Sequence, residues 1–217
     1  MPLELQPCTE PDLVDFTRIM NSAFSSLGHG MMQLLIPNPM PDDHLEKSIE
    51  KHVKSFREEE DVTYLKIIDT DLNGKMIAGA KWRINKTERT EEQIQKMLPV
   101  PGKDEEGRPA AQDFMWFLHR VRKEYMGTKP FYFLHILVTD PEHHRRGAGT
   151  MLLKWGLEQA DKDNMPAFLE SSSMARPLYT SLGFSARHEE IWDLKKYGLE
   201  GTDTSTVMIR DPVSRGK

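Results

Sequence analysis

The sequence has very little cysteine and no long apolar run. Its single cysteine, Cys8, cannot form an intramolecular disulfide, and no set of Cys and His residues has zinc-finger spacing. No stretch approaches the roughly 18 consecutive apolar residues of a membrane-spanning helix, and the N-terminal segment lacks the apolar stretch of a signal peptide. We therefore expect a cytoplasmic protein with no resident metal and no membrane association.

An excess of basic residues is also absent. The formal net charge is -5, which argues against a general nucleic-acid or anionic-membrane binder. With 217 residues, of which 38% are hydrophobic, the chain can bury one substantial core. We expect a single domain over residues 1–217 and no nucleic-acid partner, and the sequence gives no indication of the oligomeric state.

The common nucleotide-binding motifs are missing as well. Neither "GxxxxGK[ST]" nor "GxGxxG" with an acidic residue about 20 positions later occurs. The segment "PEHHRRGAGTMLLKWG" at 141–156 instead joins an apolar strand to a helix-like pattern. Helix N-termini attract anions, Gly147 and Gly149 permit close approach to the main chain, and Arg145 and Arg146 add positive charge. This loop is expected to bind a pyrophosphate.

The remaining patterns predict alternating strands and helices. Before the apolar strand we expect a strand over "LELQP", a helix after Thr9 with Asp12 in its first turn, a helix over 42–57, and a hairpin with Asn73-Gly74 at its turn. Residues 87–129 read as an insert, with a polar loop followed by a helix over 112–125. After it come a strand at 131–139, a helix to about 163, a strand over "AFLESS", a short helix over "ARPLYTSL" and two further strands.

Three regions between residues 131 and 184 together resemble the GCN5-related N-acetyltransferase (GNAT) superfamily. "HRRGAG" matches its acetyl-CoA loop, with His144 where Gln or Arg is usual. Leu137, Thr139 and Pro141 fit its Leu-x-Val-x-Pro strand, with threonine in place of valine. Tyr179 stands four residues before a Gly-Phe pair, Gly183 and Phe184, as in "YTSLGF". Other phrases resemble uncharacterised fungal members.

The resemblance implies a fold, an activity and a cosubstrate. The fold would be α/β (α+β), with a mixed central sheet of about six to seven strands flanked by helices and core strands that splay at the acetyl-CoA site. The activity would be direct transfer of the acetyl group from acetyl-CoA to the primary amine of a small molecule. A protein N-terminal or lysine acetyltransferase, and a catalytically silent acyl-CoA-binding domain, remain as alternatives.

The same resemblance assigns residues to the coenzyme. Main-chain groups of the core strand would bind the pantetheine arm and the acetyl carbonyl, and amides of the loop would bind the pyrophosphate. The expected cofactor-binding residues are Leu137, Val138, Thr139, His144, Arg145, Arg146, Gly147, Ala148, Gly149, Thr150 and Ser172.

Two residues are candidates for proton transfer. Tyr179 matches the superfamily's general acid. His135 resembles a catalytic histidine of arylalkylamine N-acetyltransferases, although their second histidine is replaced here by Phe133, and an ordinary core histidine is an equal alternative. Strand alternation predicts that Phe133, His135, Leu137 and Thr139 share one face. Glu170 is a reserve base, and the apolar segment 29–41 is the expected acceptor-specificity loop.

Overall fold

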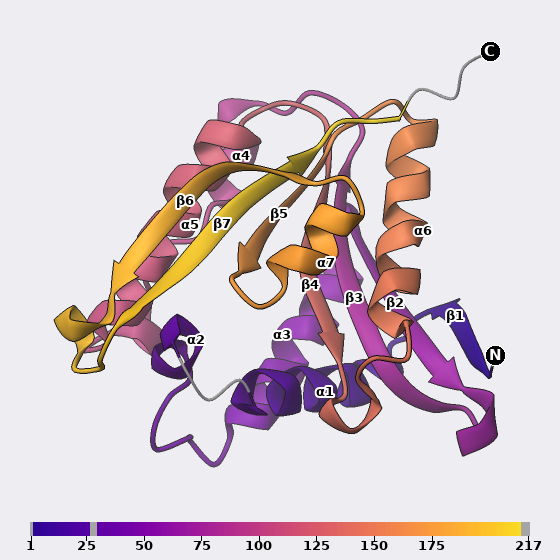
Figure 1. Cartoon of the computed structure of the whole chain (residues 1–217), viewed down its shortest axis with the longest axis horizontal. Helices are drawn as coiled ribbons and strands as arrows, with labels where there is room; N and C mark the ends of the chain where they lie inside the picture. Colours follow the sequence, from indigo (N-terminus) through magenta and orange to yellow (C-terminus); the bar gives the residue numbers. More distant parts are fainter. Residues whose placement is uncertain (1, 27–29, 214–217) are drawn as a thin grey trace.

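A seven-stranded sheet runs through the molecule in the order β1-β2-β3-β4-β5-β7-β6 (Figure 1). The computed structural model describes residues 2–26 and 30–213. The strands are β1 (Leu3–Pro7), β2 (Val62–Asp69), β3 (Lys75–Asn85), β4 (Phe131–Thr139), β5 (Ala167–Ser172), β6 (Ser185–Asp193) and β7 (Thr202–Arg210). The helices are α1 (Asp12–Ser26), α2 (Gly30–Leu35), α3 (His44–Glu58), α4 (Glu91–Met97), α5 (Pro109–Tyr125), α6 (Ala148–Lys162) and α7 (Arg176–Ser181).

The sheet is mixed, because β4 and β5 are parallel while its other neighbouring strands are antiparallel. The predicted mixed sheet with flanking helices is confirmed. The β2–β3 hairpin turns at Asn73 and Gly74, whose φ angles of 55° and 76° lie in the left-handed region that these residue types tolerate.

Helix α6 covers one face of the sheet. Its residues Leu152, Leu153 and Leu157 join a buried cluster with Trp82 of β3 and Leu134 of β4. The contact is close at Gly156, where a Cβ atom would lie 2.2 Å from the Trp82 ring, so only glycine allows this approach. Tyr179 of α7 belongs to the same cluster, which places α7 on the α6 face.

Helices α1, α3 and α5 cover the opposite face. Phe16 of α1 packs near Tyr64 of β2, and Phe117 of α5 belongs to a cluster with Phe133 of β4 and Val207 of β7. The first helix begins as expected, because the Asp12 carboxylate accepts hydrogen bonds from the Thr9 amide and hydroxyl.

The insert before β4 contains more regular structure than its polar sequence suggested. Thr90 and Gln93 form a reciprocal capping box at the start of α4. Helix α5 begins at Pro109, three residues before the predicted start, because proline is favoured in the first turn of a helix. The two helices of the insert therefore lie over the first half of β4 (Figure 1).

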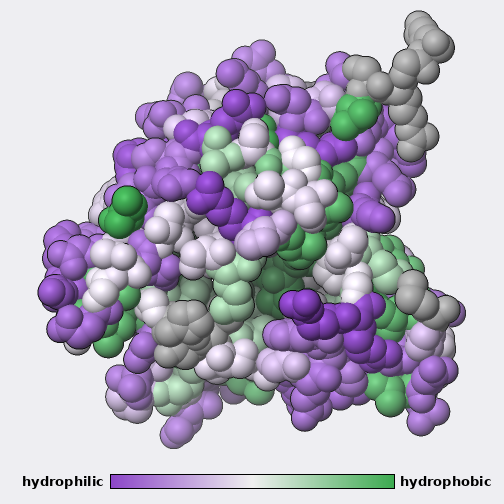
Figure 2. All heavy atoms as spheres, viewed as in Figure 1, coloured by the Kyte–Doolittle hydropathy of each residue, from purple (hydrophilic) through white to green (hydrophobic). Residues whose placement is uncertain are grey.

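The surface is mainly hydrophilic on the side seen in Figure 2, with hydrophobic atoms at the floor of a hollow beside α7 and the ends of β4 and β5. Among the described residues, we find no helix with the length and apolar character required to cross a membrane.

Candidate active site

The central feature of the site is a split between β4 and β5. These strands pair only at Tyr132 with Ala167 and at Phe133 with Phe168. Beyond this point β4 stays paired with β3 as far as Thr139, and β5 stays paired with β7 as far as Ser172. The main-chain groups of Leu137 and Thr139 face β5 and lack strand partners, as expected for splayed core strands, whereas those of Val138 are directed to β3, like the Asp140 amide that donates to Ile77.

A β-bulge in β4 lies at His135. Lys81 of β3 pairs with Ile136, whereas the next residue, Trp82, pairs with Leu134, so His135 is an extra residue in β4. The predicted alternation holds for Phe133 and His135 but is wrong for Leu137 and Thr139, which lie on the opposite face. Phe133 packs on the α5 side, whereas Leu137 packs with the α6 cluster, because the bulge reverses the order of the faces.

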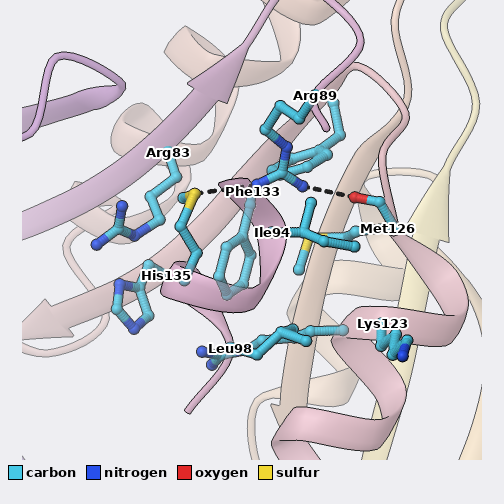
Figure 3. Close-up of a pocket in the computed structure, with 12 residues that line it drawn as sticks. Arg83, Arg89, Ile94, Leu98, Lys123, Met126, Phe133 and His135 are labelled. Atoms are coloured by element: carbon cyan, nitrogen blue, oxygen red, sulfur yellow. Dashed lines mark hydrogen bonds between the residues drawn. The ribbon is translucent and has the colours of Figure 1, made fainter. Parts of the chain in front are cut away.

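The His135 ring stays on the α5 face. It stacks on Phe133, with ring centroids 5.2 Å apart, and its Nδ1 atom is buried without a hydrogen-bond partner (Figure 3). Burial, together with the nearby charges of Arg122 and Lys81, holds the pKa of His135 well below its ordinary value. The imidazole is therefore neutral at pH 7 and has a free lone pair or N–H to offer.

The loop between β4 and α6 has the geometry of an anion site. Gly147 has a φ of 88° and precedes the first residue of α6, and no side chain caps the helix. A Cβ atom built on Gly147 would meet nothing within 4 Å, so the approach to these amides is open. The free N–H groups and the helix dipole of this 15-residue helix suit a pyrophosphate.

The two loop arginines have different surroundings. Arg145 is exposed and forms no ion pair with a described carboxylate. Arg146 donates to the buried Asp69 carboxylate at 2.6 Å, so its charge is largely neutralised. Of these two guanidiniums, that of Arg145 is therefore the more available to add charge for a phosphate.

His144, at the signature position, is also engaged. Its Nε2–H donates to the Thr139 carbonyl oxygen at 3.1 Å, so the side chain holds the loop against the end of β4. Thr139 and Leu137 themselves face the helix, since a Cβ atom on Gly149 would lie 3.9 Å from each side chain.

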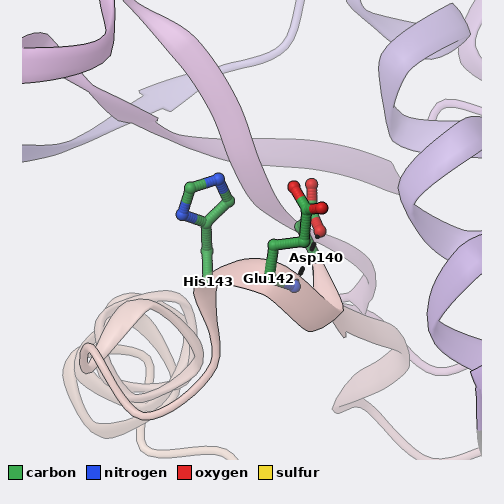
Figure 4. Close-up of side chains that lie close together, drawn as sticks. All are labelled: Asp140, Glu142 and His143. Carbon is green, nitrogen blue, oxygen red and sulfur yellow. Dashed lines mark hydrogen bonds between the residues drawn. The ribbon is translucent and has the colours of Figure 1, made fainter.

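Asp140, Glu142 and His143 gather beside this loop (Figure 4), with ligand atoms close enough to one another to suit a metal ion. The ammonium of Lys75 lies 3.8 Å from Asp140, 4.0 Å from Glu142 and 3.2 Å from His143 Nε2. This lysine already supplies a cation to the cluster, and we assign no metal to it.

Tyr179 lies on the α6 face, with 7% of its surface exposed. Its ring packs edge-on against Phe184, with centroids 6.0 Å apart, and its hydroxyl has no hydrogen-bond partner among the described residues. Burial raises the pKa of Tyr179 to about 12. The phenol therefore stays protonated and has a hydrogen bond to donate.

Ser172 and Glu170 lie at the end of β5, across the split. The Ser172 hydroxyl accepts from the Ala175 amide at 3.3 Å and shapes the turn into α7. Glu170 accepts two hydrogen bonds from Arg122 of α5, with Nε–Oε1 at 2.7 Å, and both side chains are largely buried. This supports a structural carboxylate over a reserve base.

The sequence motifs did not predict Arg122 and Asp69 as partners of Glu170 and Arg146. Arg122 interrupts the apolar face formed by Leu118 and Val121, and a charged residue at such a position was a visible signal of a buried ion pair. Asp69 ends a buried strand, but its partner Arg146 is 77 residues away, and no local pattern connects the two.

The expected specificity segment 29–41 begins outside the described residues, and its described part forms α2 followed by a loop. The Met31 amide donates to Asp203 of β7 at 2.9 Å, and Arg108 donates to the carbonyl oxygens of Leu34 and Leu35. These bonds fix α2 between α5 and β7.

Solved structures share this fold at low sequence identity. Arylalkylamine N-acetyltransferase 2 from Aedes aegypti has a TM-score of 0.67 and 13% identity, with 97% of this chain and 99% of that chain covered. A histone acetyltransferase HPA2 and related acetyltransferase from Corynebacterium glutamicum has a TM-score of 0.63 and 16% identity, with complete coverage of both chains. A putative acetyltransferase from Salmonella typhimurium, solved with its cofactor acetyl-CoA, has a TM-score of 0.57 and 14% identity, covering 100% and 98%.

The family comparison agrees with the split strands and the open helix N-terminus. The model of the acetyltransferase (GNAT) family matches residues 31–184, which is well over half of the 217 residues. The chain belongs to the acetyltransferase (GNAT) family.

Proposed function

We propose that the protein transfers the acetyl group of acetyl-CoA directly to the primary amine of a small molecule. The observation that carries this proposal is the placement of His135 and Tyr179 on opposite faces of the sheet, next to the split between β4 and β5. A proton acceptor and a proton donor on either side of one opening suit a reaction in which an amine arrives from one face and a thiolate leaves toward the other.

Main-chain amides from Arg145 to Thr150 would hold the pyrophosphate, with the Arg145 guanidinium adding charge. The free β5-facing edge of β4 at Leu137 and Thr139 would bind the amide-bearing arm and orient the acetyl carbonyl. Bound in this way, acetyl-CoA would supply a thioester carbon to the opening. The Aedes aegypti relative, an arylalkylamine N-acetyltransferase by name, supports an amine acceptor.

Tyr179 would act as the acid. Its hydroxyl is protonated over the physiological pH range and has no competing partner among the described residues, so it is free to donate to the sulfur as the thiolate leaves. His135 would act as the base, directly or through a water. The pKa of His135 is low, so it accepts a proton more readily from a strong acid. After the amine has attacked the thioester, its N–H is more acidic than that of a free alkylammonium, so His135 is better matched to the proton released after attack.

The test is a panel of primary amines with acetyl-CoA, followed by thiol release and by mass spectrometry of the acceptor. Alkylamines, arylalkylamines and ω-amino acids should include an acceptor with saturable turnover, whereas a lysine peptide and an N-terminal peptide should be acetylated more slowly. Faster peptide acetylation would replace the small-amine proposal with a protein acetyltransferase. Acetyl-CoA binding without turnover of any member would indicate a silent acyl-CoA-binding domain.

A further inference from the structure

A small cavity lies on the α5 face, between the insert and the first half of β4 (Figure 3). Arg83, Arg89, Arg122, Lys123, Phe133 and His135 line it, together with apolar side chains of α4 and α5. Its volume of about 60 Å³ is room for roughly four water molecules. The cavity therefore holds one end of a longer ligand, such as a carboxylate with the adjoining carbons, and the His135 ring forms part of its wall.

The positive charge of this cavity is only partly neutralised. Arg83 pairs with Glu59 and Asp61, and Arg122 pairs with Glu170. Arg89 and Lys123 form no ion pair with a carboxylate of the described residues. Lys123 is exposed to solvent, whereas Arg89 is partly buried, so the cost of an unpaired cation falls on Arg89, and a bound anion would offset it.

Arg89 is the more informative of these two cations. Its Nη2 donates to the Gly127 carbonyl oxygen at 2.7 Å, its Nη1 contacts Met97 Sδ at 3.0 Å, and its guanidinium lies 4.7 Å from the centroid of the Phe131 ring. These contacts fix the side chain. Its Nε is nevertheless buried without a hydrogen-bond partner, so this N–H can donate to an acceptor on a ligand.

The second unpartnered nitrogen of the cavity is Nδ1 of His135. In Figure 3, Phe133 lies between His135 and Arg89. Arg89 is stacked over Phe131, which precedes His135 by four residues on β4, a span of about 13 Å in an extended strand. One end of the cavity thus offers an anion site, and the other end offers the base of the proposed function.

We propose that the acceptor is an amino acid whose carboxylate binds Arg89, with Lys123 at the rim, while its amine reaches past His135 to the split. This inference rests on the proposed function and narrows its acceptor class. The separation between Arg89 and the split beside His135 favours an ω-amino acid, because the carboxylate and the amine of an α-amino acid are attached to the same carbon. The surrounding cations also disfavour a bound alkylammonium, so the amine enters in its neutral, nucleophilic form.

The experiment compares 6-aminohexanoate with hexylamine, which has the same chain length and no carboxylate. Wild-type protein should give at least a tenfold higher kcat/KM for the ω-amino acid. Arg89→Met keeps the packing on Phe131 and removes the charge, so it should lower kcat/KM for 6-aminohexanoate by about ten- to one-hundredfold and leave hexylamine almost unchanged. Arg187→Met, which breaks an exposed ion pair with Asp211, is the matched control and should change neither.

Equal use of the two amines by the wild type, or an equal loss for both in Arg89→Met, would overturn the proposal. Acetate should inhibit acetylation of 6-aminohexanoate competitively. Acetate that binds at Arg89 without changing the KM of the ω-amino acid would assign the cavity to a free small anion and would also overturn it. Should Arg89→Met fail to fold in a thermal melt, Arg89→Lys makes the same comparison, because it keeps the charge but loses the planar fork.

Direct binding separates this inference from the proposed function. If acetyl-CoA binds and no amine is acetylated, 6-aminohexanoate is titrated into wild-type protein and Arg89→Met and followed by NMR. Binding that the substitution abolishes would sustain the carboxylate site although amine transfer has failed. Absent binding, or binding of equal strength, would reject the carboxylate site itself.

Discussion

The imidazole of His135 stacks on the ring of Phe133, with centroids 5.2 Å apart and ring planes inclined by 30°. The phenylalanine occupies the position of a second histidine in arylalkylamine N-acetyltransferases, according to the resemblance described above. It supplies an apolar surface that cannot relay a proton. Any proton that leaves through His135 must therefore continue through Nδ1, water or the cavity beside α5.

The pH dependence of turnover tests this base. Only the neutral imidazole accepts a proton, and its pKa is lowered chiefly by burial, so the acidic limb of kcat should lie well below pH 6.5. His135→Gln should remove the limb and lower kcat by about a hundredfold or more. A glutamine variant with wild-type kcat and the same pH profile would show that His135 is only a packed strand residue.

The hydroxyl of Tyr179 is tested by Tyr179→Phe, which keeps the packing against Phe184. The expected loss in kcat is about one-hundred- to ten-thousandfold, with little change in acetyl-CoA affinity by calorimetry. Since a phenol donates only when protonated and the pKa of Tyr179 is about 12, wild-type kcat should show no fall attributable to this group between pH 9 and 11. Unchanged turnover in the variant would mean that the thiolate leaves without the phenol.

The loop arginines should differ in their effects. Arg145→Glu reverses a free, exposed charge, so acetyl-CoA affinity should fall by about tenfold at low salt, less at high salt, with an unchanged melting temperature. Arg146→Met breaks the pair with the buried Asp69 and should chiefly lower the melting temperature. Calorimetry and thermal melts on both variants distinguish the two roles. The reverse pattern would contradict this assignment.

Lys81 is a buried cation whose burial lowers the free energy of unfolding. Its ammonium donates to the Ser55 hydroxyl at 2.7 Å, and burial lowers its pKa from 10.5 to about 8. That shift corresponds to about 3 kcal/mol, and loss of the hydrogen bond offsets about 1 kcal/mol. Lys81→Met should therefore raise the free energy of unfolding at pH 7 by about 1–3 kcal/mol.

The sign of the pH effect provides a check on Lys81. Folded Lys81 loses its proton near pH 8, whereas the unfolded side chain keeps it to about 10.5, so wild-type stability from this group rises across that window. The advantage of Lys81→Met should shrink accordingly in urea titrations between pH 7 and pH 10.5. Lys54→Met, at an exposed position of α3, should show no such trend. A constant difference across the window would contradict the lowered pKa.

Local patterns predicted the elements of the fold, because those elements depend on neighbouring residues. Asn73-Gly74 specified the hairpin through its backbone conformation, and the apolar spacing from Leu13 to Ile19 specified the buried face of α1. The loop before α6 was readable in the same way, since Gly147 and the following helix start lie side by side in the sequence.

The geometry of the site was less predictable, because it depends on residues that are distant in the sequence. The bulge at His135 arises from the register between β3 and β4, which the alternation of β4 alone does not contain. The unpaired state of Arg89 likewise depends on which carboxylates the fold brings near it. Arg83 forms ion pairs with Glu59 and Asp61, and Arg122 forms one with Glu170. Arg89 forms no ion pair with a carboxylate of the described residues.

The short pairing between β4 and β5 also affects the tendency of the sheet to aggregate. A strand with free N–H and C=O groups is normally a template on which a foreign strand can pair, and proteins protect such edges with charge, twist or cover. Here two of these edges face each other inside the sheet, with α6 on one side and α1 packed against the free end of β4 on the other. The unpaired N–H and C=O groups of β4 and β5 thus remain available to an extended ligand, while their position inside the sheet hinders pairing with strands of other chains.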